Sequence, residues 1–412
     1  MNKTRTLVSD YFSLSLVQFS FYLIPFFVTP YIVRTISPNH YGMLELATNF
    51  VAYLTVVVSF GFDITGSRAI LDAKTISEQS RIFYAIIGAK SLLFAASVLL
   101  SLPLIFIASP LHEIFVPIVI NFIVLAASVI TPVWYFQAVQ RLPFFARTNL
   151  FAKIIYAIIV VATVKTNDTY LNIPLANAGT MLLFAVYVLW EAYRNMGRIV
   201  NVPDRIWMFQ LLKEGMPFFL SSVMISLYTT TCMFVLGLYS SPTRVAFYSA
   251  AAKVITVSQA VVIMPIARLI FPVIGDTIRN DFQKGYKQIR QVLFVIIGLG
   301  GAVAVGLFFG ARVIVIVMFG AEYEPSIPVL RILCIVPLAV GLSNLFGIQG
   351  LINMGFDRWL FWATVAGAIV GLLSNFLLTP MFQEVGAAGS LVIAEIVMAI
   401  LTYGLFRRAS RI

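Results

Sequence analysis

The segment FYAIIGAKSLLFAASVLLSLPLIFI, residues 83–107, holds a single charged side chain, Lys90. A helix rises about 1.5 Å per residue, so about twenty such residues are enough to cross a hydrocarbon core roughly 30 Å thick. Similar stretches recur along the 412-residue chain, which is 60% hydrophobic and only 11% charged, whereas soluble domains are about one quarter charged. The sequence therefore predicts an integral membrane protein, and long apolar runs without polar alternation favour helices over membrane-barrel strands.

Twelve apolar windows of this length follow one another along the sequence. We expect transmembrane helices at residues 11–33, 42–60, 83–107, 114–139, 146–164, 172–192, 216–239, 245–272, 289–318, 326–350, 359–379 and 387–406. The predicted fold class is an all-α integral membrane protein. Lys3 and Arg5 precede the first window, as in a signal peptide, but the window runs for about 23 residues without a small-residue cleavage site, so we interpret it as a retained helix.

The twelve predicted helices divide into two similar halves. Residues 37–42, SPNHYG, align with residues 241–246, SPTRVA, at an offset of 204 residues. We expect an N-terminal six-helix lobe at 1–198, a cytoplasmic amphipathic linker at 199–215 and a C-terminal six-helix lobe at 216–412. Six helices per half give both halves the same orientation, related by an axis along the membrane normal. The prediction is two pseudo-symmetric lobes around a central cavity.

Lysine and arginine residues are distributed unevenly between the two sides of the membrane. When the Lys and Arg residues are sorted by the side of the membrane nearest to them, leaving aside Lys90, Lys153, Lys253 and Arg331, the poorer side receives only Arg34, Lys165, Arg244 and Arg312. Positively charged loops remain in the cytoplasm, so we expect both termini on the cytoplasmic side. The net charge of +11 then reflects this topology, and no nucleic-acid partner is predicted.

Among the basic side chains inside the predicted helices we single out four as candidates for a site: Lys90, Lys153, Lys253 and Arg331. Each central Lys or Arg costs roughly 2.5–3.5 kcal/mol to insert, so the four cost on the order of 10 kcal/mol unless snorkelling or pairing relieves them. Lys90 and Lys253 lie about nine residues inside their helices, about 13 Å from the end and close to the membrane midplane. We predict an intramembrane anion site centred on these two lysines. Lys153 and Arg331 either extend the path or snorkel to the interface.

Two acidic residues, Glu45 and Glu395, also fall inside predicted helices. Intramembrane carboxylates either couple transport to protons or sodium ions or pair with a neighbouring lysine, and the sequence leaves both readings open. The two cysteines and two histidines are not spaced as metal ligands or as a nucleophile and its base. No metal site, cofactor or enzymatic activity is predicted.

Six short motifs are spread over nearly the whole chain. They are PYIVR with Pro38 and YG (30–42), GFDITGSR (61–68), PVWYFQ (132–137), LKEGMP (212–217), YSAAAK (248–253) and GAAG (386–389). In this order they resemble bacterial polysaccharide flippases of the O-antigen (Wzx) type. That family belongs to the MOP superfamily, which also includes lipid II flippases and MATE exporters.

The resemblance implies that the substrate is an oligosaccharide unit linked to undecaprenyl pyrophosphate. It would be moved from the cytoplasmic to the periplasmic leaflet of the bacterial inner membrane by ion-coupled alternating access. A pyrophosphate diester carries about two negative charges, which need Arg or Lys partners in a cavity of low dielectric constant. Arg34, Arg68 and Arg268 are candidates for gate or headgroup contacts, although Arg68 and Arg268 also fit ordinary cytoplasmic charges. The implied partners are membrane lipids and the polymerase and chain-length-control proteins of glycan assembly, and we expect a monomer.

Two other functions are consistent with a many-spanning chain. A MATE-like exporter of drugs or metabolites takes organic cations, which favour acidic cavity residues. The candidate residues singled out inside the predicted helices are basic rather than acidic by four to two. A membrane O-antigen polymerase or ligase is an enzyme and resembles chains with a large periplasmic loop, which this sequence lacks. We therefore rank a lipid-linked oligosaccharide flippase first.

Overall fold

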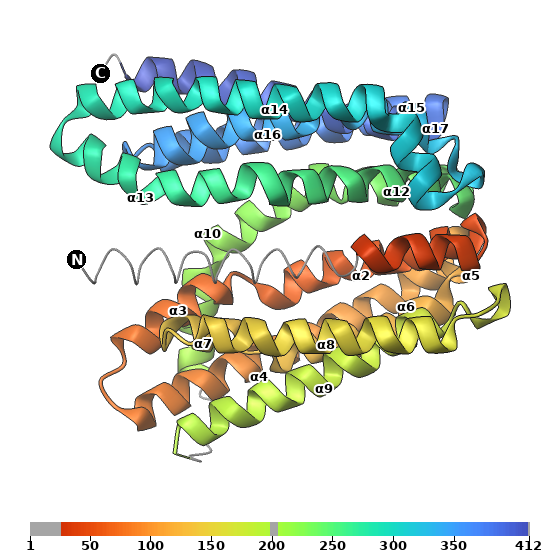
Figure 1. The fold of residues 1–412 in the computed structure, drawn as a ribbon. Helices are drawn as coiled ribbons and strands as arrows, with labels where there is room; N and C mark the ends of the chain where they lie inside the picture. The colour runs from red at the N-terminus through yellow and green to blue at the C-terminus, as the bar shows by residue number, and fades with distance from the viewer. Residues whose placement is uncertain (1–25, 198–204, 411–412) are drawn as a thin grey trace. The chain divides into compact units, whose positions relative to one another are not determined.

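A computed structural model describes residues 26–197 and 205–410 of the chain (Figure 1). Within these ranges the secondary structure is helical and contains no strand, which confirms the predicted all-α class. The described residues form two compact units. The first takes those of Met1–Ile36 and Met43–Val223, and the second takes Ser37–Gly42 and those of Met224–Ile412.

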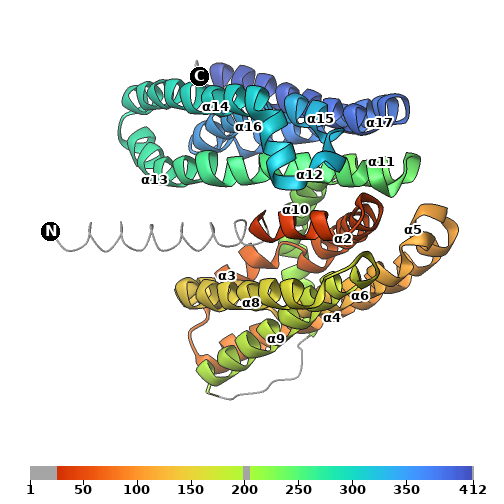
Figure 2. The ribbon, with the colours of Figure 1, turned by 45° about the vertical axis from the view of Figure 1, so that its right-hand side comes forward.

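The first unit contains a helical segment at residues 26–35, most of α2, and the helices that follow it as far as the N-terminal part of α10. Their bounds are α2 Pro38–Ser59, α3 Phe62–Asp72, α4 Ile76–Ile107, α5 Ser109–Glu113, α6 Phe115–Ile130, α7 Val133–Ala138, α8 Leu142–Thr163, η1 Asn167–Thr169, α9 Asn172–Asn195 and α10 Arg205–Thr229. Thr75 starts α4, because its hydroxyl accepts the Glu78 N–H at 3.1 Å and so caps the helix. In this unit α9 packs against both α6 and α8 (Figure 2).

Two of the sequence motifs meet in the core of the first unit. Pro132 has no N–H, and the helix is interrupted here: α6 ends at Ile130 and α7 begins at Val133. Trp134, which follows the break, is fully buried, and its ring centroid lies 5.1 Å from that of Phe83. A Cβ on Gly66 of α3 would lie 2.7 Å from Ile86 Cδ1 and 3.3 Å from the Trp134 ring. Glycine at this position therefore lets α3 approach α7.

The second unit contains the end of α10 and all later helices. Their bounds are α11 Thr231–Tyr239, α12 Pro242–Ser258, η2 Gln259–Ile263, α13 Met264–Asn280, α14 Phe282–Phe319, η3 Ala321–Tyr323, α15 Ser326–Leu333, α16 Val336–Asn344, η4 Leu345–Ile352 and α17 Asp357–Ala409. Asp281 caps α14 by accepting the Lys284 N–H at 3.1 Å, and this hydrogen bond lowers the pKa of the Asp281 carboxyl.

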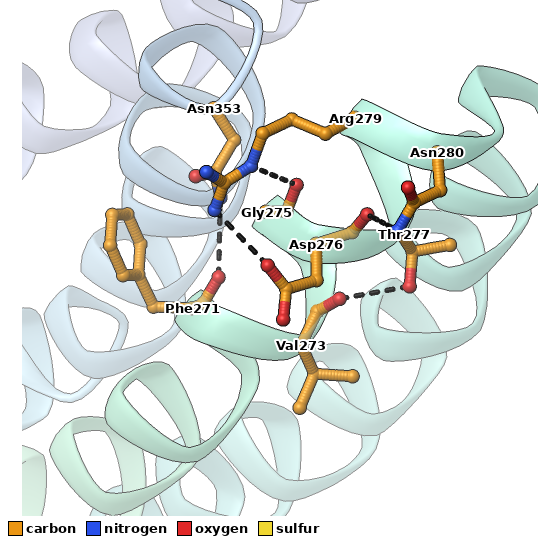
Figure 3. Close-up of polar contacts among 8 residues, drawn as sticks. All are labelled: Phe271, Val273, Gly275, Asp276, Thr277, Arg279, Asn280 and Asn353. Atoms are coloured by element: carbon orange, nitrogen blue, oxygen red, sulfur yellow. Dashed lines mark hydrogen bonds and ion pairs between the residues drawn. The ribbon is translucent and has the colours of Figure 1, made fainter.

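Side-chain amides tie η4 to α13 in the second unit. Gln349 Nε2 donates to the Ala267 carbonyl at 2.9 Å, and Asn353 Nδ2 donates to the Phe271 carbonyl at 3.4 Å. Figure 3 shows the Asn353 side chain directed at the Phe271 carbonyl. Pro272 lies inside α13, and a proline removes one internal hydrogen bond from a helix. The two amides therefore bond to carbonyls in the turn of α13 that precedes Pro272 and hold it against η4 and Asn353.

Many of the helices are long and apolar enough to cross a membrane. Within residues 26–197 and 205–410 there are nine such helices, and the pair α10 and α11, bent by 46°, adds a tenth if it forms one span. The chain is therefore a multi-pass membrane protein. Two predicted helices, 359–379 and 387–406, lie within α17, a run of 53 residues that bends at Gln383, where φ is 53° and ψ is −127°.

Two further predictions concern segments that the structure describes only in part. The predicted first helix, 11–33, lies mostly outside the described residues, which begin at residue 26. Residues 199–204 of the predicted linker also lie outside them. Residues 205–215 form the first part of α10, so this part of the predicted linker is the beginning of a longer helix.

The aligned segments of the two sequence halves have the same local structure. A helix ends at residue 35 and α2 begins at Pro38, and in the second half α11 ends at Tyr239 and α12 begins at Pro242. The two helix ends are 204 residues apart, and so are the two helix starts, which is the offset of the sequence alignment. Proline suits the first turn of a helix because its missing N–H would have no partner there. The sequence repeat is thus matched by a repeat in local structure.

Candidate functional site

The nine residues predicted to bind substrate or couple an ion are divided between the two units. Those of the first unit are Arg34, Glu45, Arg68, Lys90 and Lys153, and those of the second are Lys253, Arg268, Arg331 and Glu395. The lysines are held by partners inside their own unit, whereas the arginines are exposed on its surface.

Lys90 is the most buried of the four predicted intramembrane cations, with 4% of its surface exposed. Its ammonium donates a hydrogen bond of 2.7 Å to the carbonyl of Ser128 in α6. In a continuous helix that carbonyl accepts the N–H four residues later, but this residue is Pro132, which has none. The carboxylate of Asp63 acts on Lys90 electrostatically from α3. Lys90 therefore supplies the donor that Pro132 lacks, so the fold already uses part of the predicted anion site.

Replacing Lys90 with methionine keeps an unbranched side chain but removes the donor. We expect Lys90→Met to lose about 1–3 kcal/mol of folding free energy, because a carbonyl is left without its partner. Thermal unfolding in detergent measures this loss. Lys153→Met is the matched control and is expected to lose less, because Lys153 Nζ makes a longer hydrogen bond of 3.4 Å to Asn177 Oδ1. A Lys90→Met protein that unfolds at the wild-type temperature would contradict the structural role.

Lys153 is half-buried between α8 and α9. Besides the hydrogen bond to Asn177 of α9, its ammonium lies 5.8 Å from the centroid of the Tyr156 ring. Both contacts are made inside the first unit. They favour pairing within the protein over snorkelling to the interface as the way in which this charge is accommodated.

Lys253 contacts an aromatic residue from the other half of the sequence. Its ammonium donates a hydrogen bond to the Tyr41 hydroxyl and lies 4.9 Å from the centroid of the Tyr41 ring. Tyr41 belongs to Ser37–Gly42, which we call the clasp. The clasp packs with the second unit, although the residues before and after it, Ile36 and Met43, belong to the first. A cation is attracted to the face of a tyrosine ring, so Lys253 holds the clasp through charge as well as a hydrogen bond.

Close backbone packing holds the end of the clasp. Gly42 is buried, and a Cβ built on it would lie 1.7 Å from the carbonyl oxygen of Pro242, so only glycine fits. Tyr41 is 2% exposed and packs edge-on to Tyr323, with ring centroids 6.4 Å apart. The ring centroid of Tyr323 in turn lies 5.7 Å from that of Phe247. The two aligned segments of the sequence halves thus meet directly at Gly42 and Pro242.

The candidate arginines differ from the lysines in being exposed: they are Arg34, Arg68, Arg268 and Arg331. The guanidinium of Arg68 lies 5.7 Å from the centroid of the Phe218 ring, and that of Arg331 lies 5.6 Å from the centroid of the Phe308 ring. Contact with an aromatic face leaves the outer side of a guanidinium able to bind another group. For Arg331, exposure on α15 fits the snorkelling reading that the sequence left open.

The two predicted coupling acids have different surroundings. Glu395 of α17 is 5% exposed, and no lysine or arginine of the described residues lies within ion-pair distance of its carboxylate. It acts electrostatically on Tyr228 and Cys232. Glu45 of α2 is half-buried. Within the described residues, Glu395 therefore lacks the lysine partner that the sequence left open. Among residues 26–197 and 205–410, no three His, Cys, Asp or Glu side chains are grouped to hold a metal ion.

Two ion pairs that bury a carboxylate were not predicted from the sequence. Glu191 of α9 is 6% exposed and pairs with Arg141 at 3.1 Å. Glu384 is 4% exposed and pairs with Arg244 of α12 at 2.7 Å, next to the bend at Gln383. The partners are separated by 50 and 140 residues, so no local spacing in the sequence indicates either pair.

The sequence matches a known protein family. The family described as "Polysaccharide biosynthesis protein" matches residues 7–278, more than half of the chain. The chain is 28% identical over 391 residues to an Escherichia coli (strain K12) protein named "Putative O-antigen transporter", with 93% of this chain and 92% of that protein covered. A Shigella dysenteriae protein of the same name is 26% identical over 393 residues, covering 94% of this chain and 96% of that protein.

Solved structures of two transporters share the fold. The lipid II flippase MurJ, in an inward closed conformation, gives a TM-score of 0.76 at 15% sequence identity and covers 98% of this chain and 90% of that chain. An inward-facing multidrug resistance MATE family transporter of the MOP superfamily gives a TM-score of 0.69 at 14% identity and covers 96% of this chain and 98% of that chain. At these identities the likeness concerns the fold alone.

Proposed function

Because this chain belongs to the polysaccharide biosynthesis protein family, we propose that it is a flippase for a lipid-linked oligosaccharide. The inferred substrate is an O-antigen or similar repeat unit on undecaprenyl pyrophosphate, moved from the cytoplasmic to the periplasmic leaflet by alternating access. The observation that carries this proposal is similarity to two proteins named as O-antigen transporters over more than nine-tenths of the chain. The shared fold with MurJ and a MATE transporter supports transport rather than enzymatic catalysis.

The pyrophosphate of this substrate gives the intramembrane lysines a role. Lys253 is half-buried, and its ammonium donates a hydrogen bond to the neutral hydroxyl of Tyr41. An anionic phosphate oxygen is a stronger acceptor for the same ammonium than a neutral hydroxyl. Lys90 is committed to the Ser128 carbonyl. We therefore rank Lys253 first as the anion ligand and give Lys90 a supporting role. The remaining candidates for contacts along the substrate path are Lys153, Arg331, Arg34, Arg68 and Arg268.

Ion coupling is part of the same proposal. Glu395 is a buried carboxylate without a basic partner among the described residues, and an intramembrane carboxylate in this state needs a proton or a cation to be stable. We propose Glu395 as the first candidate for coupling to a proton or sodium ion. Glu45, which is half-buried in α2, is the second.

The proposal includes the arrangement of the chain in the membrane. We infer twelve transmembrane helices in two six-helix lobes, 1–198 and 216–412, around a central cavity. We infer cytoplasmic termini from the distribution of positive charge. We infer location in the bacterial inner membrane from the family to which the chain belongs. The partners that fit this function are membrane lipids and the polymerase and chain-length-control proteins of glycan assembly, and the transporter would act as a monomer.

A MATE-like exporter of drugs or metabolites is the second candidate function. The shared fold with a multidrug MATE transporter favours it, as does the buried acid Glu395, because organic cations bind to acidic residues. The basic character of the other intramembrane charges favours an anionic substrate instead. A membrane O-antigen polymerase or ligase ranks third, because the sequence has no large loop to carry catalytic residues.

Reconstitution of the purified protein into liposomes tests the proposal. Undecaprenyl-pyrophosphate-linked oligosaccharide is placed in both leaflets, and a membrane-impermeant glycosidase reports the fraction that becomes accessible from outside. We expect the protein to make the inner-leaflet pool accessible, while protein-free liposomes protect about half of the lipid because the bilayer blocks polar headgroups. Transport of a cationic dye without movement of the lipid-linked sugar would replace the proposal with the MATE-like function.

A further inference from the structure

We propose that the Tyr41 hydroxyl accepts the hydrogen bond of Lys253 only in the absence of substrate. The phosphate of the substrate takes the place of this hydroxyl at the Lys253 ammonium and thereby releases the clasp from the second unit. The inference rests on the proposed function, because it requires an anionic substrate at Lys253. It assigns a role to Ser37–Gly42 that neither the family match nor the similarity to transporters specifies.

The clasp occupies an unusual position in the chain. Its six residues pack with the second unit, but the chain enters it from Ile36 and leaves it at Met43, both of which belong to the first unit. Any movement of the clasp away from the second unit must therefore break the contacts that Ser37–Gly42 make there. The strength of those contacts decides whether this segment stays with the second unit.

Two of the contacts that the clasp makes with the second unit respond differently to a ligand. The approach of Gly42 to the Pro242 carbonyl is backbone packing without charge, so an anion leaves it unchanged. The contact of Tyr41 with Lys253 is a hydrogen bond to an ammonium together with a cation 4.9 Å from the ring centroid. Both parts depend on the position of one flexible lysine side chain.

Substrate and Tyr41 compete for that side chain. The ammonium is a compact point charge on a flexible stem, and it binds a phosphate oxygen more strongly than a neutral phenol because the hydrogen bond is then charged on both sides. When Lys253 turns to a phosphate, Tyr41 loses the hydrogen bond from Nζ and the cation at its ring face. A neutral lipid offers no such acceptor. The clasp would therefore respond to the anionic end of the substrate.

Hydrogen–deuterium exchange of the full-length protein in lipid nanodiscs tests this inference. The readout is deuterium uptake in peptides that cover Ser37–Gly42. The probes are undecaprenyl pyrophosphate, uncharged undecaprenol and inorganic pyrophosphate, and binding of each is measured separately with radiolabelled compound. Tyr41→Phe removes the hydroxyl that Lys253 bonds. Tyr31→Phe is the matched control, because Tyr31 donates a hydrogen bond of 2.6 Å to the Val164 carbonyl outside the clasp.

We expect undecaprenyl pyrophosphate to speed exchange in the clasp of the wild-type protein by about tenfold, the effect of losing one typical hydrogen bond on a local opening equilibrium. Undecaprenol is expected to have no effect. Tyr41→Phe should exchange faster before any probe is added and change little afterwards, and Tyr31→Phe should behave as wild type. Release by inorganic pyrophosphate as well supports the inference and assigns the trigger to the anion alone. Release only by the lipid-linked form supports it with the lipid required.

Two results overturn the inference. One is binding of undecaprenyl pyrophosphate without faster exchange in the clasp, which leaves the proposed function standing. The other is a Tyr41→Phe protein whose clasp exchanges at the wild-type rate in every condition. Absence of undecaprenyl pyrophosphate binding to the wild-type protein is a different failure, since it removes the anion site of the proposed function and the inference with it.

Discussion

A Lys253→Gln protein is expected to reach the membrane at the wild-type level and yet to support much less surface-glycan display than the wild type. Glutamine keeps a hydrogen-bonding group near Tyr41 but carries no charge for a phosphate. A hydrogen bond to a charged group contributes about 1.5–3 kcal/mol, so we expect a loss on the order of 10- to 100-fold. The measurement is complementation of a strain that lacks its own O-antigen transporter, with glycan quantified on gels and the protein by immunoblot of membranes.

Two variants control this experiment. Lys253→Arg keeps the charge and is expected to retain part of the display, because a guanidinium also binds phosphate. Lys165→Gln removes a lysine that likewise lies near a tyrosine ring, 6.0 Å from the centroid of Tyr31, but is exposed and outside the predicted helices. It should display glycan as the wild type does. Wild-type display by Lys253→Gln would remove Lys253 from the proposed anion site.

A Gly42→Ala substitution is expected to have the largest effect on folding. The added methyl group would lie 1.7 Å from the Pro242 carbonyl oxygen, and neither partner is a flexible side chain, so the backbones of the two segments must separate. Overpacking of this kind costs about 1–3 kcal/mol and sometimes more. We expect a lower unfolding temperature in detergent and faster deuterium uptake in the clasp.

Gly298→Ala is the matched control for this substitution. Gly298 lies inside α14, and a Cβ added there meets nothing within 4 Å. Alanine is a better helix former than glycine by about 0.8–1 kcal/mol, so this variant should unfold at the wild-type temperature or above. A Gly42→Ala protein with wild-type stability and slow exchange in the clasp would show that the segment is not closely packed against α12.

The helical class and most membrane-crossing segments could be predicted from the sequence because they depend on local properties. Apolar length decides whether a helix crosses a membrane, and the segment around Lys90 has that length whatever it packs against. The bend inside α17 falls at Gln383, within residues 380–386, which the sequence leaves between the predicted helices 359–379 and 387–406. Which residue carries the bend could not be predicted, because a positive φ is uncommon for a residue other than glycine.

The candidate site was harder to predict because burial does not reveal what a charge contacts. Lys90 and Lys253 have the same depth by sequence, yet Lys90 is bonded to a carbonyl and Lys253 to a tyrosine from a different part of the chain. The Lys90 contact has a sequence signal, since Pro132 removes an N–H four residues after Ser128. The alignment of residues 37–42 with 241–246 is another signal, but it does not indicate that the two segments touch.

The hydrogen bond from Lys90 to Ser128 has a consequence for how this protein can vary during evolution. Lys90 is needed because Pro132 supplies no N–H to the Ser128 carbonyl, so Lys90 and Pro132 are expected to be conserved as a pair. We expect a change at either site alone to destabilise the protein, whereas loss of both would restore a continuous helix with no unsatisfied carbonyl. Relatives should therefore keep or lose the pair together, and a lysine retained without its proline would mark a lineage in which this charge serves the substrate instead.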